Sequence, residues 1–353
     1  MENKNIKIAF FDAKPYDIKS FDLENKAFNY KIEYFNYRLN KETAITAKGY
    51  EIVCAFVNDI ISEEVINILY ENGTKLLALR CAGFNNLDFK ATLNKIHVVR
   101  VPDYSPYAIA EHAAALMLSL NRKVHKAYYR TRDNNFNIDG FLGFDMHAKT
   151  AGIIGTGKIG KVLIKILKGF GMEVLAYDAF QNIEAEKELG FKYVDLDTLY
   201  KNSDIISLHC PLNKDTYHLI NAESINKMKD NVMIINTSRG QIIDTKALIE
   251  GLKNKKVGNA GLDVYEEEND YFFEDFSATV LEDDTLARLL SFTNVLVTSH
   301  QAFFTKEALH NIAETTLLNI KEYIEGKQLT NEICYKCNML GSDCRRTKGL
   351  NCF

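Results

Sequence analysis

The 353-residue sequence lacks the features of a membrane or secreted protein. It contains no apolar run of the ~18 residues that a membrane-spanning helix needs. The longest candidate, residues 108–120, is interrupted by Glu111 and His112. The first residues lack the basic start and the small-residue cleavage site of a signal peptide, and they lead directly into the apolar residues 6–11. We therefore expect a cytoplasmic protein with no membrane partner.

A strong excess of charge of one sign is also absent. The formal net charge is −4, so we expect no nucleic-acid partner. Hydrophobic residues make up 46% of the chain and charged residues 25%, as in ordinary globular proteins, and the length allows two domains with full cores. Cys54, Cys81 and Cys210 lie in or beside apolar runs, which is typical of reduced cysteines in the core of a cytosolic protein.

The most distinctive feature that is present is a glycine turn between two apolar runs. Gly155, Gly157 and Gly160 form a G-x-G-x-x-G pattern, and Asp178 ends the next apolar run. The glycines allow a tight turn, close approach of a pyrophosphate and close helix packing, and the helix N-terminus favours phosphate. A bare glycine turn with a helix-capping acid is the alternative, but the strand–turn–helix–strand context favours a dinucleotide site. Asp178 would accept ribose hydroxyls and repel a 2′-phosphate, which predicts NAD.

Strand-like and helix-like runs alternate along most of the chain, which predicts an α/β fold with doubly wound parallel sheets. Early strands are expected at residues 6–11, 31–35, 52–57, 76–80 and 97–101. A long helix is predicted over 106–124, starting after Ser105, with Pro106 in its first turn. Later strands are expected at 151–154, 173–177, 192–194, 204–208, 232–236, 259–262 and 295–298, about the number in a Rossmann sheet. Residues 306–326 have helical spacing and are predicted to cross back to the first domain.

Three of the later strands are followed by chemically active side chains. Arg239 follows residues 232–236, the acids 266–268 follow residues 259–262, and His300 follows residues 295–298. Ligands of doubly wound sheets bind at the carboxyl ends of strands, so these side chains could share one site.

Reduction of a 2-keto acid requires residues of these types. The planar fork of an arginine binds the carboxylate and polarises the carbonyl, a histidine donates the proton, and a carboxylate on its other ring nitrogen stabilises the imidazolium. The residues alone leave alternatives open: Arg239 as a surface ion-pair partner, His300 as a structural histidine, and the acids as a solvated turn.

Longer runs of the sequence resemble the D-isomer-specific 2-hydroxyacid dehydrogenases, and most of all their bacterial D-lactate dehydrogenases. The runs that carry the resemblance span residues 13–17, 79–88, 101–112, 152–160, 209–212, 236–240, 261–266 and 299–303, in the family's order. The resemblance implies two Rossmann-like doubly wound domains with the active-site cleft between them. The expected boundaries are residues 1–103 plus 300–333 for a discontinuous substrate domain and 104–299 for the NAD-binding domain.

The resemblance also implies roles for individual residues. The catalytic residues would be Arg239, Glu268 and His300, with Glu268 selected among the three acids by the family's spacing. The cofactor NAD would contact Gly155, Gly157, Lys158, Ile159, Gly160, Asp178, Cys210, Pro211, Thr216, Thr237, Ser238, Arg239 and Asp263. The substrate would contact Ala82, Gly83, Tyr104, Arg239, His300 and Phe303. For the two aromatic residues, plain packing between domains is the alternative. No metal is expected in this site.

The end of the chain departs from the family, whose members usually stop near residue 332. Cys334, Cys337, Cys344 and Cys352 lie in this extension and begin as C-x-x-C, which could hold zinc. Their later spacing is irregular, however, and no apolar run accompanies them. The interpretation adopted is a disordered tail over residues 334–353.

The expected function is reversible, NADH-dependent reduction of pyruvate to D-lactate. The alternatives are the same chemistry on a larger 2-keto acid such as 2-ketoisocaproate, or a non-catalytic NAD-sensing protein. The resemblance implies subunits that pair through the cofactor domain, as a homodimer or homotetramer. The segment 126–145 is the expected interface, because Tyr128, Tyr129, Phe136, Phe141, Leu142 and Phe144 lie there among charges. The alternative is that these rings pack on their own domain.

Overall fold

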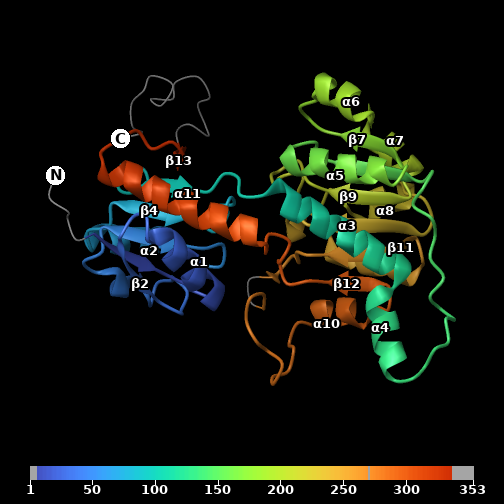
Figure 1. Cartoon of the computed structure of the whole chain (residues 1–353), viewed down its shortest axis with the longest axis horizontal. Coiled ribbons are helices and arrows are strands. Elements are labelled where there is room, and N and C mark those ends of the chain that lie inside the picture. The colour runs from blue at the N-terminus through green and yellow to red at the C-terminus, as the bar shows by residue number, and fades with distance from the viewer. Residues whose placement is uncertain (1–5, 269–270, 336–353) are drawn as a thin grey trace. The chain divides into compact units, whose positions relative to one another are not determined.

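The computed structural model describes residues 6–268 and 271–335, and the chain divides into two compact units (Figure 1). Unit 1 comprises Met1–Ser105 and Thr305–Phe353, and unit 2 comprises Pro106–Phe304. Of the predicted tail, Cys334 is buried with a free thiol, while Cys337, Cys344 and Cys352 lie outside the described residues. Within the described ranges, no helix has both the length and the apolar character needed to cross a membrane.

Unit 1 is built on a six-stranded sheet in the order β13-β5-β4-β3-β1-β2, parallel except for β13. Its strands are β1 (Lys7–Phe10), β2 (Lys31–Tyr34), β3 (Ile52–Ala55), β4 (Leu76–Leu79), β5 (His97–Arg100) and β13 (Glu332–Ile333). Its helices are α1 (Pro15–Asn25), η1 (Ala44–Ala47), α2 (Glu63–Glu71) and α11 (Lys306–Ile324). All residues of β3 and β4 are buried, as expected for central parallel strands with both faces covered.

The helix α11 belongs to unit 1 although it lies late in the sequence. It packs against α1 and against β4 and β5. Thr305 caps its N-terminus by accepting a hydrogen bond from the N–H of Ala308 at 3.2 Å, and Asn319 donates to the carbonyl of Arg100 at 2.9 Å. Apolar periodicity and this amide contact together attach the end of the chain to the first sheet.

Unit 2 contains a seven-stranded parallel sheet in the order β12-β11-β10-β9-β6-β7-β8. Its strands are β6 (Thr150–Ile154), β7 (Glu173–Tyr177), β8 (Lys192–Tyr193), β9 (Ile205–Leu208), β10 (Val232–Asn236), β11 (Val257–Leu262) and β12 (Val295–Val297). The chain proceeds from β6 outward through β7 to β8, then returns to β9 on the other side of β6. The order therefore reverses between β6 and β9, which is the switch point where such sheets bind ligands.

Helices cover both faces of this sheet. They are α3 (Pro106–Arg122), α4 (Val124–Arg132), α5 (Lys158–Gly169), α6 (Ile183–Leu189), α7 (Leu196–Asn202), α8 (Ala222–Lys227), η2 (Gly240–Ile242), α9 (Thr245–Lys253) and α10 (Asp284–Ser291). Side chains of β10 alternate between two hydrophobic cores: Ile234 packs with residues of α7 to α10, while Met233 and Ile235 pack with α3 and α5. This alternation produces the doubly wound architecture.

The helix predicted over residues 106–124 is shorter than expected. It ends at Arg122, Lys123 adopts a left-handed backbone with φ of 50°, and α4 begins at Val124. The ammonium of Lys123 donates to the carbonyls of Gly140 and Leu142 at 3.0 and 3.1 Å. The segment that contains Gly140 and Leu142 therefore holds the break between α3 and α4 in place. Neither a glycine nor a proline marks this break in the sequence.

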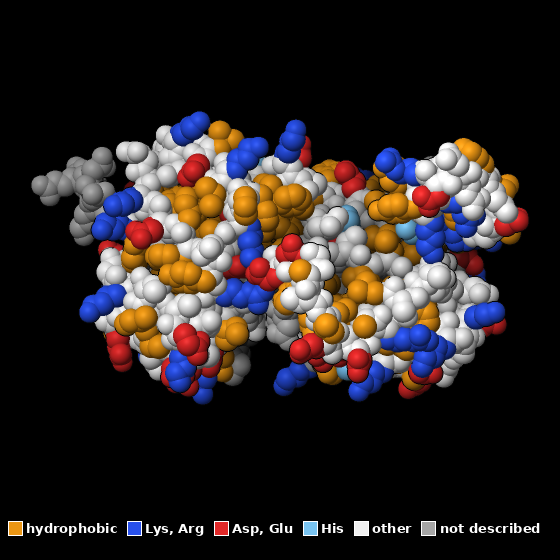
Figure 2. Space-filling view, turned by 90° about the horizontal axis from the view of Figure 1, so that it is seen from below, with side chains coloured by type: hydrophobic (Ala, Val, Ile, Leu, Met, Phe, Trp, Pro, Cys, Tyr) orange, Lys and Arg blue, Asp and Glu red, His pale blue; other side chains and the backbone are white. Residues whose placement is uncertain are grey.

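Acidic and basic side chains are both scattered over the face drawn in Figure 2, with hydrophobic side chains between them. This distribution agrees with the small net charge of −4. The exposed hydrophobic side chains include several on the segment after α4, among them Phe136 and Leu142.

Candidate active site

The glycine turn lies between β6 and α5, at the switch point of the unit 2 sheet. Gly155 has φ of +99°, and a Cβ there would lie 2.5 Å from the carbonyl oxygen of His209. A Cβ on Gly160 would lie 2.1 Å from the carbonyl oxygen of Gly155. Gly157, which precedes α5, has open space around it and no side-chain cap. The turn therefore combines a corner with a positive φ, close helix packing and an open helix N-terminus, the three conditions for a dinucleotide phosphate site.

Asp178 follows β7 and lies beside this turn. Its Oδ2 accepts hydrogen bonds from the N–H of Thr156 at 2.6 Å and the hydroxyl of Thr156 at 3.0 Å. Its Oδ1 accepts the N–H of Phe180 at 2.9 Å. The carboxylate is half-buried. Asp178, the acid predicted to bind the ribose, is thus hydrogen-bonded to Thr156, the residue between the first two glycines of the motif.

The residues after β9 and β10 lie next to the switch point. Ser238 donates its hydroxyl to the carbonyl of Leu208 at 2.8 Å, which ties the ends of the two strands together. The hydroxyl of Thr237 is buried and has no hydrogen-bond partner among the described residues. Burial raises the pKa of Cys210 to about 11, so its thiol stays protonated. Thr216 donates to the carbonyl of Pro211 at 2.6 Å.

Asp263 is fully buried after β11 and holds the loop that carries His300. Its Oδ1 accepts the hydroxyl of Thr298 at 2.5 Å and the N–H of Gln301 at 2.9 Å, and its Oδ2 accepts the N–H of Ala302 at 2.8 Å. The Nε2 of His112 on α3 lies 3.3 Å from Oδ1. His112 is a residue of this network that the sequence did not predict, and the only local signal is a polar residue on a mostly buried helix.

His300 and Glu268 form a hydrogen-bonded pair. The Nδ1 of His300 lies 2.8 Å from Oε1 of Glu268, and Oε2 of the same carboxylate accepts the N–H of Tyr265 at 2.9 Å. A carboxylate only accepts hydrogen bonds, so Nδ1 carries the proton and Nε2 is left for a substrate. The two side chains are 18% and 14% exposed, so the pair is largely desolvated. The ring of Phe273 lies 5.9 Å from that of His300 and 6.5 Å from that of Phe303.

The geometry also separates the three neighbouring acids. Glu266 accepts from the hydroxyl of Thr245 at 2.7 Å and lies 2.6 Å from Nε2 of His218. Glu267 is exposed. Glu268 is the acid that contacts His300. Glu266 therefore ties the turn to α9.

Arg239 follows β10 and is half-buried. Its carbonyl accepts from the amide of Asn236 at 2.9 Å, and its Nη1 donates to the carbonyl of Ser238 at 2.7 Å. No ion pair within the described ranges involves Arg239, so its guanidinium has no carboxylate partner there. A half-buried cation without a protein anion is suited to bind an anionic ligand.

The predicted substrate residues of unit 1 lie after β4 and β5. The guanidinium of Arg100 donates to the carbonyl of Ala82 at 2.6 Å. The thiol of Cys81 donates to the carbonyl of Gly83 at 3.3 Å. Before them, Arg80 is buried between the rings of Phe10 and Phe56, at 4.4 and 4.5 Å from their centroids.

Tyr104 lies in the same unit, and its carbonyl accepts from Asn311 at 2.5 Å. Arg100, which the sequence did not single out, holds the loop that carries Ala82 and Gly83. Its signal in the sequence is a charged residue at the end of an apolar strand.

Comparison with known proteins identifies relatives along nearly the whole chain. Residues 114–302 match the model of the D-isomer specific 2-hydroxyacid dehydrogenase, NAD binding domain. The D-lactate dehydrogenase of Escherichia coli K12 is 51% identical over 329 residues, which cover 93% of this chain and 100% of that protein.

Solved structures agree with the sequence relatives. The apo-structure of the Escherichia coli D-lactate dehydrogenase has a TM-score of 0.84, at 49% identity, covering 93% of this chain and 100% of that one. The D-lactate dehydrogenase of Lactobacillus jensenii with NAD+ has a TM-score of 0.78, at 33% identity, covering 93% and 99%.

Proposed function

This chain belongs to the D-isomer specific 2-hydroxyacid dehydrogenase family, and we propose that it reduces pyruvate to D-lactate with NADH and catalyses the reverse reaction. The observation that carries the proposal is the desolvated pair of His300 and Glu268, in the same unit as an arginine that has no carboxylate partner in the described ranges. Identity of 51% to a D-lactate dehydrogenase supports pyruvate as the substrate.

The residues of unit 2 fit the NAD that the family binds. The open, uncapped helix N-terminus at Gly157 suits a pyrophosphate, and Asp178 suits the ribose hydroxyls. The residues after Asp178, which are Ala179 to Asn182, include no cation that would bind a 2′-phosphate. When bound, NADH supplies the hydride that reduces the keto carbon.

The proposed roles of the catalytic residues follow from their hydrogen-bonding capacity. Arg239 binds the substrate carboxylate and polarises the keto group through its planar fork of donors. His300 donates the proton to the keto oxygen from Nε2, because its Nδ1 is already bonded to Glu268. Glu268 fixes the orientation of the ring and stabilises the imidazolium before transfer.

The roles of the other substrate residues stay predictions. Ala82 and Gly83 would donate their N–H groups to the substrate carboxylate, and Tyr104 and Phe303 would exclude water from it. Exclusion of water strengthens each electrostatic contact with the substrate.

A pair of neighbouring variants tests the proposed roles. NADH oxidation with pyruvate is measured for the wild-type enzyme, for Glu268→Gln and for Glu266→Gln. We expect Glu268→Gln to lower kcat by about 10-fold or more, since it removes the charge that supports a general acid worth about 10²–10⁴. Glu266→Gln, two residues away and bonded to Thr245 and His218, keeps kcat near the wild-type value.

Two results would contradict the proposal. Absence of pyruvate-dependent NADH oxidation by the wild-type protein would exclude the reaction and favour an NAD-sensing protein. Equal effects of the two glutamate substitutions would remove Glu268 from its role. His300→Gln provides the third comparison, with an expected loss in kcat of about 10² or more and little change in NADH affinity.

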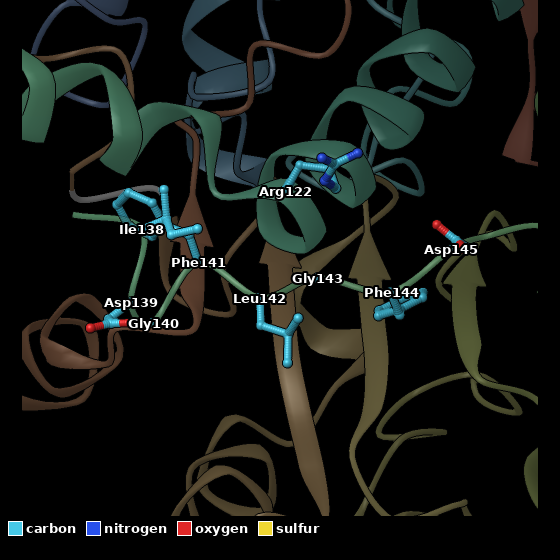
Figure 3. A pocket seen from close by; sticks show the side chains of 9 residues that line it. All are labelled: Arg122, Ile138, Asp139, Gly140, Phe141, Leu142, Gly143, Phe144 and Asp145. Atoms are coloured by element: carbon cyan, nitrogen blue, oxygen red, sulfur yellow. The ribbon is translucent and has the colours of Figure 1, made fainter. Parts of the chain in front are cut away.

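We also propose that the protein self-associates through the segment after α4. Ile138 and Leu142 are 78% and 91% exposed, and with Arg122 they line a pocket along this segment (Figure 3). Phe141 instead stacks on Arg130 at 3.7 Å, and Phe144 packs against the core, so part of the expected interface contacts its own unit. The remaining exposed apolar side chains support pairing with a second copy as a homodimer or homotetramer.

The proposed compartment is the cytoplasm. The free thiols of Cys54, Cys81, Cys210 and Cys334 support this assignment, because a reducing compartment keeps unpaired thiols in this state.

A further inference from the structure

Beyond the catalytic residues, unit 2 contains a chain of hydroxyl groups that ends on Asp178. The hydroxyl of Tyr193, on the edge strand β8, lies 2.7 Å from the hydroxyl of Thr156. The N–H of Asn182 donates to the hydroxyl oxygen of Tyr193 at 3.0 Å. Thr156 in turn contacts the carboxylate of Asp178. Four residues separated in the sequence thus form one hydrogen-bonded chain.

The direction of every hydrogen bond in this chain is determined by its two ends. The backbone N–H of Asn182 can only donate, and the carboxylate of Asp178 can only accept. The hydroxyl hydrogen of Thr156 therefore points to Asp178, and that of Tyr193 points to Thr156. Hydrogen bonds aligned in one direction polarise one another and hold their members in a single arrangement.

The chain leaves one oxygen of Asp178 for a ligand. Oδ2 already accepts two hydrogen bonds from Thr156, one from the N–H at 2.6 Å and one from the hydroxyl at 3.0 Å. A carboxylate oxygen has about two lone-pair sites, so Oδ2 is filled. A further donor must bind at Oδ1, which accepts the N–H of Phe180.

Tyr193 itself is held firmly. Its ring packs edge-on against Phe191, with centroids 4.9 Å apart, and its backbone N–H donates to Oε1 of Glu186 on α6 at 2.9 Å. Figure 1 shows α6 beside β7 at this edge of the unit 2 sheet. The hydroxyl of Tyr193 is therefore a fixed donor to Thr156.

We propose that Thr156 and Tyr193 are positioning residues for the cofactor: they orient Asp178 so that its Oδ1 accepts the 2′-hydroxyl of the adenosine ribose. The proposal rests on the ribose-binding role of Asp178. It places part of the selectivity for NADH over NADPH in two uncharged side chains that do not themselves bind the ribose. The orientation of Asp178 serves a hydrogen bond that NADH can make and that NADPH, which carries a phosphate at the 2′ position, cannot make.

The test measures dissociation constants of NADH, NADPH and 2′-deoxyadenosine NADH by fluorescence titration, with no need for turnover. Thr156→Val removes the hydroxyl at constant shape, Thr156→Ser retains it, and Tyr193→Phe removes the donor to Thr156. We expect Thr156→Val and Tyr193→Phe to weaken NADH about 3- to 10-fold, the range for loss of one hydrogen bond. Thr156→Ser stays within about 2-fold of the wild type. Thr156→Val and Tyr193→Phe do not weaken binding of the 2′-deoxy analogue, because it lacks the 2′-hydroxyl that Oδ1 is proposed to accept.

A matched control and five outcomes separate this proposal from simpler explanations. Tyr200→Phe removes another buried hydroxyl of unit 2, one without a partner in the described ranges, and should leave NADH affinity unchanged. Equal weakening of all three cofactors by Tyr193→Phe would show a structural role only. Unchanged NADH affinity in Thr156→Val, or equal loss in Thr156→Ser, would overturn the proposal. If Asp178→Ala also binds NADH normally, the role of Asp178 itself is refuted, whereas a loss confined to Asp178→Ala refutes the chain alone.

Discussion

Acid should destabilise unit 2 through His209, a half-buried histidine that follows β9 and whose ring nitrogen Nδ1 is buried. Burial lowers the pKa of His209 from 6.5 to about 4. Its Nε2 lies 2.8 Å from the hydroxyl of Ser207, while its Nδ1 has no partner among the described residues. A neutral ring can donate from Nε2 and leave Nδ1 bare, whereas an imidazolium would bury a second N–H without an acceptor.

The direction and size of the effect follow from the two pKa values. Between pH 6.5 and about 4 the unfolded chain binds more protons at this histidine than the folded chain, so the free energy of unfolding falls as the pH falls. At about 1.4 kcal/mol per pKa unit, the penalty has a ceiling of about 3 kcal/mol and reaches about 2 kcal/mol by pH 5. That is a substantial share of the ~5–15 kcal/mol that stabilises a typical domain.

The assay compares urea unfolding of the wild type and His209→Gln between pH 5 and pH 8. The glutamine can still donate to Ser207 but takes up no proton. Since the chain contains no tryptophan, far-UV circular dichroism follows the transition, and the step that NADH shifts to higher urea belongs to unit 2. We expect the difference in unfolding free energy between the two proteins to change by about 2 kcal/mol from pH 7 to pH 5. Other acid-sensitive groups are common to both proteins and cancel.

His310, whose pKa is shifted in the opposite direction, provides the control. The Nδ1 of His310 in unit 1 lies 2.7 Å from Oε1 of Glu24, and this hydrogen bond raises the pKa of His310. Its stabilisation is complete at low pH and is lost as the pH rises, so His310→Gln should cost stability on the acid side only. Parallel pH curves for the wild type and His209→Gln would refute the reasoning about His209.

Three further predictions concern activity and assembly. Arg239→Lys keeps the charge but loses the fork, so the KM for pyruvate should rise and kcat should fall; a change in KM alone would make Arg239 a uniform binder. In a kinetic panel of 2-keto acids, pyruvate should have a higher kcat/KM than 2-ketoisocaproate, and the reverse ranking would move the proposal to the larger substrate. Light scattering at micromolar concentration should give at least twice the 40.2 kDa of one chain, with Leu142→Glu shifting the mass downward, whereas a wild-type mass near 40.2 kDa would exclude self-association.

The sequence predicted the parts of the site that depend on local physics. The glycine turn could be identified because Gly155 needs a positive φ and Gly160 has no room for a Cβ, and such constraints select the residue type directly. The ends of the parallel strands could be located because buried strands appear as apolar runs. The resemblance then selected Glu268 from three adjacent acids. The local sequence pattern could not select Glu268, because Glu266 differs from it in its contacts with the distant residues His218 and Thr245.

Contacts between distant residues are what the sequence could not reveal. The chain from Tyr193 to Thr156 joins residues 37 positions apart, and Tyr193 lies on a strand of only two residues. Such a strand is too short to produce a period of two. Likewise, the sequence predicted about the right number of strands for a Rossmann sheet but gave no order for them. Their order, with its reversal between β6 and β9, depends on which helices cover which face.

The backbone of His300 illustrates why a catalytic geometry needs the three-dimensional structure. His300 has φ of +52°, a conformation that a residue with a Cβ rarely adopts. The surroundings compensate for this strain: Asp263 accepts three hydrogen bonds from the flanking Thr298, Gln301 and Ala302, and its own carbonyl accepts the N–H of His300 at 2.7 Å. Because Asp263 is fully buried, these donors satisfy a carboxylate that would otherwise be costly to bury. The same acid thus fixes a strained loop that presents His300 to Glu268, and its residue type alone indicates none of this.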